Sequence, residues 1–242
     1  MTLAILSALA DEQRGLIEQL QQPQQVKHAG RVFWLGTLYG HPVVLALSRI
    51  GKVSAAVTAS ALIEHFGAQR IVFTGVAGGV GAGVLLGDVV VATQFIQHDL
   101  DVSPLFPRFE VPSYGQSCFA ADASLRRQLM QASRSALQKM GSAAKVHSGL
   151  LASGDQFVGS AQASSAVCNA LAASGHQPLA VEMEGAAVAQ VCHDYGVPFA
   201  AVRTISDRAD ASAHGDFTAF ARDVASRYSD AIIHEFLKML FL

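Results

Sequence analysis

The chain has 242 residues, of which 51% are hydrophobic and 15% charged, and its formal net charge is -2 with neutral histidines. This composition argues against a disordered chain, and it provides no basic surface for a nucleic-acid backbone. No apolar run reaches the roughly 18 residues of a membrane span, and the three cysteines have neither a disulfide framework nor metal-ligand spacing. We therefore expect one domain over residues 1–242, in a reducing cytoplasm, that binds neither nucleic acid nor membrane.

Apolar runs of strand length alternate with helical patterns along most of the chain. Residues 31–51 contain two strand-like runs around a turn at Gly40, which predicts a β-hairpin. The other strands are expected at residues 2–8, 70–76, 87–96, 143–153, 178–183 and 198–205. Helices are expected at residues 11–22, 52–67, 121–140, 161–173, 184–195 and 217–240. This alternation predicts a single-domain α/β fold with a central, mixed but mostly parallel twisted sheet and helices on both sides.

Two segments do not fit this alternation. Residues 98–117, HDLDVSPLFPRFEVPSYGQS, are long, irregular and aromatic, which favours a functional loop. Residues 74–83, TGVAGGVGAG, contain look-alikes of a dinucleotide-binding motif, but the residues after them are strand-like rather than helical. We expect either a tight turn between strands or a loop whose backbone N–H groups approach a small ligand closely.

Polar residues follow the carboxyl ends of several predicted strands. In open α/β sheets, ligands bind beyond these ends. Unpaired charge buried elsewhere in so apolar a chain would cost several kcal/mol per ion. We therefore expect one crevice to contain Glu12, residues 75–79, Asp155, Glu184, Ser206 and Asp207.

Eight motifs carry a family resemblance through their order and spacing. They are AILSALADE, IGKVSAA, FTGVAGGV, LGDVVVA, HDLDV, SGDQF, VEMEGAAVAQVCHDYGVPF and VRTISDRAD. Together they resemble the nucleoside phosphorylase family, and within it the bacterial 5'-methylthioadenosine/S-adenosylhomocysteine nucleosidases. The resemblance covers essentially the whole chain, and VEMEGAA followed by a strand and ISD is its most specific part.

The resemblance implies hydrolysis of the bond between adenine and a 5'-thio-substituted ribose, with no metal or organic cofactor. Such a reaction needs an acid for the departing base and a base for the attacking water. By resemblance, Asp207 is the general acid and Ser206 orients it. Glu12 positions and deprotonates the water, and Arg203 helps to bind Glu12 or that water.

Substrate contacts are also implied by the resemblance, in a site near the interface of a homodimer. Glu184 would bind the ribose hydroxyls, with Met183 packed against the sugar. Phe157 would stack on adenine, and the backbone at Val158 would contact the purine edge. The remaining contacts are expected from Val76 and Gly78 in the glycine segment and, for the 5' substituent, from Leu9, Ile50, Val102, Phe217 and either Phe106 or Phe109.

Each of these residues also has a purely structural interpretation. Glu12 and Glu184 could be solvated carboxylates near helix N-termini, and Asp207 could be a helix or turn cap. Arg203 could be a structural partner of Glu182 or Glu184. Phe157 and Phe217 could be ordinary core aromatic residues.

Three further polar residues are assigned no chemistry. Asp155, in SGDQF, is interpreted as a structural loop residue. His98 and His193 have no partner at metal-ligand spacing.

The chain departs from the family pattern at two positions. Val76 stands where the nucleosidases usually have a hydroxyl residue that helps to bind the water. Arg49 stands where a small residue is common, and it could bind phosphate, bind an anionic substrate group, or be an exposed charge. The segment 99–117 also differs from the usual pattern, so the 5' substituent stays open.

Three functions remain possible. The first is a hydrolytic nucleosidase for methylthioadenosine, S-adenosylhomocysteine or a relative such as an aminofutalosine. The second is a phosphorylase of the same fold, and the third is a binding protein that releases no base. An aspartate at position 207, where 6-oxopurine enzymes of the family tend to have asparagine, favours adenine, because a carboxyl group can both donate to N7 and accept from the 6-amino group.

Overall fold

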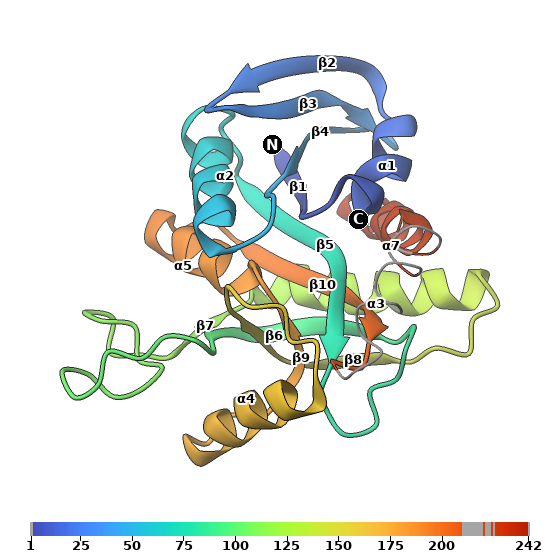
Figure 1. The fold of residues 1–242 in the computed structure, drawn as a ribbon. Helices are drawn as coiled ribbons and strands as arrows, with labels where there is room; N and C mark the ends of the chain where they lie inside the picture. The colour runs from blue at the N-terminus through green and yellow to red at the C-terminus, as the bar shows by residue number, and fades with distance from the viewer. Residues whose placement is uncertain (1, 210–219, 221–223, 225, 242) are drawn as a thin grey trace.

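The computed structural model describes residues 2–209, 220, 224 and 226–241 (Figure 1). Its strands form one sheet of ten strands. The strands are β1 (Leu3–Ser7), β2 (Gln21–His28), β3 (Arg31–Leu38), β4 (His41–Leu47), β5 (Arg70–Gly79), β6 (Val89–Gln97), β7 (Cys118–Ala120), β8 (Val146–Ser153), β9 (Pro178–Glu182) and β10 (Phe199–Asp207).

The sheet is mixed, as expected. Parallel pairing joins β4, β1, β5 and β10 in that order, and it also joins β6, β8 and β9. These two parallel groups meet through antiparallel pairs, β10 with β6 and β5 with β9. The strands β5, β10, β6, β8 and β9 therefore pair in a closed ring, and β1, β4, β3 and β2 extend the sheet beyond it.

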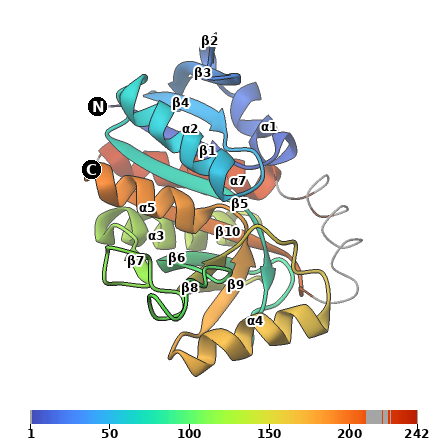
Figure 2. The same ribbon diagram turned by 60° about the vertical axis from the view of Figure 1, so that its left-hand side comes forward.

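Helices cover both faces of the sheet (Figure 1, Figure 2). One apolar core lies under α2 and α5, and a second lies under α1, α3 and α7. A third, smaller cluster includes Leu171 of α4 and Val158. The helices are α1 (Ala10–Glu18), α2 (Lys52–Glu64), α3 (Ala123–Lys139), α4 (Ala161–Ala173), α5 (Gly185–Tyr195) and α7 (Ser226–Lys238).

Local sequence explains where several helices begin and end. The Asp122 carboxylate accepts from the amides of Ser124 and Leu125 at the start of α3, and Ser160 accepts from Ala163 at the start of α4. Gly196 ends α5 with a φ of 63°, a backbone conformation that glycine adopts without steric cost. The predicted helix at 217–240 corresponds to α7 from Ser226 onward, and most of its earlier part lies outside the described residues.

Two strands were not predicted. The helix expected over residues 11–22 ends at Glu18, and β2 begins at Gln21. The sequence of β2, QQPQQVKH, is polar because the strand is at the edge of the sheet and is mostly exposed, and such an edge tolerates Pro23. The short strand β7 follows the irregular segment 98–117.

The hairpin predicted around Gly40 is confirmed as the antiparallel pair β3 and β4. The turn or loop predicted over the glycine segment is wrong for Thr74 to Gly79, which continue β5, whereas residues 80–83 do lie in the connection between β5 and β6. No helix in the described part of the chain is long and apolar enough to cross a membrane.

Candidate active site

One pocket lies where several strands end, as the sheet topology predicts. Its empty volume is about 470 Å³, part of which is open to solvent. Its walls come from the ends of β1, β5, β9 and β10 and from the segments that follow β4 and β8. The residues that line it are Ala8, Leu9, Glu12, Ile50, Val76, Ala77, Gly78, Phe157, Val181, Glu182, Met183, Glu184, Ser206 and Asp207.

Most of the expected site residues are therefore brought together by the fold. Val158 lies beside them, because it lines a smaller adjoining pocket with Gly78, Phe157 and Asp207. Ile50 and Phe157 are 56% and 49% exposed, so they lie at the rim of the main pocket. The rim is thus apolar, whereas the carboxylates are buried within.

Several expected residues within the described part of the chain do not line either of these pockets. Arg203 is buried among the pocket carboxylates, and Val102 lies in the segment between β6 and β7, which projects from the rest of the fold (Figure 1). Phe109 is fully buried in the third apolar cluster, so it does not contribute to an apolar slot. Asp155 is exposed and lies outside the crevice where we expected it. Phe217 lies outside the described residues.

Glu12 is 2% exposed and lies in the first turn of α1. The backbone amides of Ala8 and Leu9 donate to Oε2 at 2.8 and 2.9 Å, and the amide of Val76 donates to Oε1 at 3.0 Å. Burial raises the pKa of Glu12, although the charge of Arg203 and the three amides oppose this. Glu12 is therefore firmly oriented, and its pKa is shifted upward, toward the range of a general base at neutral pH.

The glycine segment leaves room for two carboxylates. A Cβ atom on Gly75 would lie 2.8 Å from Oε1 of Glu12, and one on Gly78 would lie 2.9 Å from Oδ1 of Asp207. Both distances are shorter than ordinary carbon–oxygen contacts. Glycine is therefore required at both positions by the close approach of the acids to strand β5.

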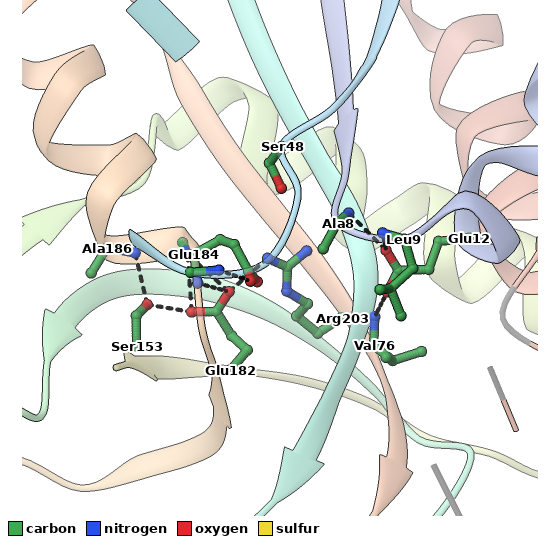
Figure 3. Close-up of polar contacts among 12 residues, drawn as sticks. Ala8, Leu9, Glu12, Ser48, Val76, Ser153, Glu182, Glu184, Ala186 and Arg203 are labelled. Atoms are coloured by element: carbon green, nitrogen blue, oxygen red, sulfur yellow. Dashed lines mark hydrogen bonds and ion pairs between the residues drawn. The ribbon is translucent and has the colours of Figure 1, made fainter. Parts of the chain in front are cut away.

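Arg203 lies between two groups of carboxylates (Figure 3). Its Nη2 donates to Oε2 of Glu182 at 2.7 Å, and its guanidinium lies 4.0 Å from the centre of the Phe73 ring. Its side chain is 1% exposed, and its Nε and Nη1 have no hydrogen-bond partner among the described residues. The direct hydrogen-bond partner of Arg203 is thus Glu182 rather than Glu12.

Glu182 lines the pocket, although sequence reasoning assigned it no role beyond a possible partner for Arg203. It also accepts from the amides of Glu184 and Gly185, at the start of α5, and from the hydroxyl of Ser153 (Figure 3). A carboxylate that accepts several N–H groups at a helix N-terminus is strongly stabilised. Its position at the end of a predicted strand, shortly before the helical run that starts at Gly185, is a sequence signal that could have identified it.

Glu184 is 5% exposed, and the amide of Gly51 donates to its Oε1 at 2.9 Å. Burial and the nearby charge of Glu182 raise the pKa of Glu184, while Arg203 and the Gly51 amide oppose this rise. The carboxylate therefore lies in the pocket wall at a site that disfavours its charge. A ligand hydroxyl at this place would stabilise it by donating a hydrogen bond.

Asp207 is 2% exposed and lies at the end of β10. The hydroxyl of Ser206 donates to its Oδ2 at 2.9 Å, and the amide of Ala209 donates to its Oδ1 at 2.8 Å. Both contacts orient the carboxyl group at the pocket wall. The contact from Ala209 supports the turn-cap interpretation, and the same carboxyl group also lines the pocket.

The described part of the chain contains no group of three or more histidine, cysteine, aspartate or glutamate side chains that could bind a metal ion. Arg49 has a φ of 62° and an exposed side chain whose Nη2 donates to the carbonyl of Gly30 at 2.6 Å. Since Arg49 does not line the pocket, its contacts fit an exposed charge better than a phosphate ligand.

Comparison with known proteins agrees with this geometry. The sequence model of the phosphorylase superfamily matches residues 2–238. A 5'-methylthioadenosine/S-adenosylhomocysteine nucleosidase of Bacillus thuringiensis is 35% identical over 96% of this chain and 97% of its own length.

Two solved structures show the same fold. The 5'-methylthioadenosine/S-adenosylhomocysteine nucleosidase of Neisseria meningitidis, in complex with methylthio-immucillin-A, has a TM-score of 0.89 and 35% identity over 98% of this chain and 99% of that one. A futalosine hydrolase of Helicobacter pylori has a TM-score of 0.86 and 30% identity over 99% of this chain and 98% of that one. The chain therefore belongs to the phosphorylase superfamily, and the relatives that resemble it include nucleosidases.

Proposed function

We propose that the protein hydrolyses the N-glycosidic bond of 5'-thio-substituted adenine nucleosides such as 5'-methylthioadenosine and S-adenosylhomocysteine. The observation that carries this proposal is the meeting of Glu12, Glu184 and Asp207 at one pocket, each from a different strand end. Full-length similarity to nucleosidases supports it. Hydrolysis releases adenine and a 5'-thio-substituted ribose.

Glu12 is the general base in this proposal. It accepts a proton from water as the water oxygen attacks C1' of the ribose, and burial raises its pKa, which makes it a stronger base than an exposed carboxylate. Arg203 supports the water through its unpartnered Nε and Nη1 groups. Val76 has no side-chain hydroxyl, but its amide already donates to Glu12, so the backbone orients the base.

Asp207 is the general acid. As the bond from C1' to the base breaks, the electron pair goes to adenine, and a proton from Asp207 at N7 neutralises it. The hydroxyl of Ser206 keeps the carboxyl group in place. Phe157 stacks on the base, and the backbone at Val158, in the adjoining pocket, contacts the purine edge.

The ribose is bound by Glu184, with Met183 against its apolar face. Gly78 lets the base approach strand β5 closely. The 5' substituent extends toward the apolar rim at Leu9 and Ile50. Val102 and Phe217 are the further contacts that the family resemblance implies. Its chemical identity is the least constrained part of the proposal, since a futalosine hydrolase is also among the similar structures.

We also propose a homodimer with the pocket near its interface, in the cytoplasm. Exposed apolar side chains on α2, Val53 at 76% and Val57 at 40%, support an interface close to the rim residue Ile50. A partner chain would bring Val102 to a slot from which it is remote within one chain. The cysteine count supports a reducing compartment.

The test is the release of adenine from 5'-methylthioadenosine by purified protein, with and without phosphate. We expect release that does not depend on phosphate, and a loss of at least about a hundredfold in kcat for Glu12→Gln, because the base is removed. Glu18→Gln, at an exposed position of the same helix, is the matched control and should match the wild type. Release only with phosphate would identify a phosphorylase, and binding without release would identify a nucleoside-binding protein.

A further inference from the structure

A cluster of polar side chains next to the pocket has no role in the proposed chemistry. It joins three segments that are far apart in the chain: the start of α2, the residues after β6, and the residues after β8. Its members are Lys52, Asp99 and Asp155, and we call them the Lys52–Asp99–Asp155 network. They lie beside a second surface hollow, separate from the pocket, that Lys52 and Asp155 help to line.

Three hydrogen bonds join the members of the network, and Lys52 Nζ also donates to Oε1 of Gln97 at 3.0 Å. Lys52 Nζ donates to Oδ1 of Asp99 at 2.6 Å, the amide of Asp155 donates to Oδ2 of Asp99 at 2.8 Å, and the amide of Lys52 donates to Oδ1 of Asp155 at 2.7 Å. All three bonds have a charged partner, so each is stronger than a bond between neutral groups. The lysine and Asp99 side chains are only 17% and 22% exposed, which limits screening by solvent.

One residue links this network to the pocket. Gly51 precedes Lys52, and its amide is the donor to Oε1 of Glu184 at 2.9 Å. Two successive amides therefore reach two different carboxylates, Glu184 in the pocket and Asp155 outside it. This requires an unusual backbone at Gly51, whose φ is 95°, and a Cβ atom there would lie 3.0 Å from Oδ1 of Asp155.

We propose that the Lys52–Asp99–Asp155 network positions the Gly51 amide against Glu184 and so orients the carboxylate that binds the ribose. This inference rests on the proposed function in one respect, the identity of the ribose as the ligand of Glu184. The network fixes the start of α2 by side chains from two other segments, and Gly51 cannot shift without breaking the bond from Lys52 to Asp155. Lys52, Asp99 and Asp155 are positioning residues, because none of them lines the pocket.

The variant Asp155→Ala tests the proposal by removing a single acceptor. The amide of Asp155, which donates to Asp99, remains in this variant. Asp155→Asn keeps an oxygen that can accept from the amide of Lys52, so it should restore the contact. The matched control is Asp101→Ala, an exposed aspartate in the irregular segment 98–117 that also contains Asp99; Asp101 accepts from Ser103 and pairs with Arg108.

We expect Asp155→Ala to lower kcat/KM for 5'-methylthioadenosine by about tenfold or more, since small displacements of positioned groups have effects of this size. Inhibition by free adenine should stay within twofold, because adenine does not contact Glu184. Asp155→Asn and Asp101→Ala should behave as the wild type. A crystal structure of Asp155→Ala should show the Gly51 amide more than 3.5 Å from Glu184.

Three results would overturn the proposal. They are full activity in Asp155→Ala, an unchanged distance from the Gly51 amide to Glu184 in its crystal structure, and an equal loss of adenine affinity, which would mean that the network only shapes the loop around Phe157. Failure of the proposed function gives a different result, because the wild type itself would then release no adenine. The crystal structures of wild type and variant would still decide whether the network positions Glu184.

Discussion

At the scale of single residues, the pocket depends on two glycines as much as on its carboxylates. Gly75 and Gly78 lie in the buried strand β5, and a Cβ atom at either position would lie less than 3 Å from a carboxylate oxygen. The acids can reach the pocket wall only because these two positions have no side chain. The glycines therefore position the chemistry without taking part in it.

Replacement of Gly75 by alanine should reduce catalysis more than stability. The new Cβ would displace Glu12, so we expect kcat to fall about a hundredfold, the effect of moving a catalytic group by about 1 Å. Gly79→Ala is the matched control, since its Cβ would lie 3.0 Å from a methyl carbon of Ile205 instead of an acid. It should lower the free energy of unfolding by about 1–3 kcal/mol with little loss of kcat. Equal losses of kcat in both variants would contradict this account.

At the scale of elements, α3 and α7 are joined by one carboxylate. Glu235 of α7 accepts from Ser135 and Lys139 of α3, both at 2.6 Å, and from Lys238 at 2.9 Å. Burial opposes its ionisation, but these hydrogen bonds outweigh burial and lower the pKa of Glu235 to about 2. Both helices cover the same face of the sheet, so this link stabilises the side of the fold opposite α2 and α5.

Glu235→Gln should weaken this link in a pH-dependent way. Since the pKa is lower in the folded state, ionised Glu235 stabilises the fold above its ordinary value of 4.5, and this contribution is lost as pH falls toward 2. At pH 7 we expect the free energy of unfolding to fall by about 1 kcal/mol, a modest value because both lysines are half exposed. Urea unfolding from pH 7 to pH 3 measures it, with Glu18→Gln as control. A difference that does not shrink at low pH would refute this assignment.

At the scale of the whole molecule, the proposed homodimer can be tested by a charge on its expected interface. Val53→Asp should convert the wild-type dimer to a monomer, because an ionised side chain cannot be buried there without a partner. Leu86→Asp, at a residue that is 48% exposed after β5, is the control and should leave the dimer intact. Sedimentation velocity measures both. A monomeric wild type, or a Val53→Asp dimer, would contradict the proposed interface.

Periodicity in the sequence predicted most of the fold. The hairpin β3–β4 and helix α4 were predicted at almost their observed positions, because their apolar spacing and bounding residues are local signals. The strand β2 was missed, since an exposed edge strand has no buried face to impose apolar alternation on its sequence. The prediction of one domain over residues 1–242 stays a prediction.

The acids of the pocket were predictable because they follow buried strands, and parallel strands bring those ends together, whereas Leu9, Ile50, Phe157 and Met183 were expected there from the family resemblance. The contacts that these side chains make with one another were not predictable. That Arg203 pairs with Glu182, that Gly75 faces Glu12, and that Asp155 lies outside the pocket depend on contacts between segments distant in sequence. The sequence specifies which groups are available, whereas packing in three dimensions decides which of them are within hydrogen-bonding distance, and hydrogen bonds act only over about 3 Å.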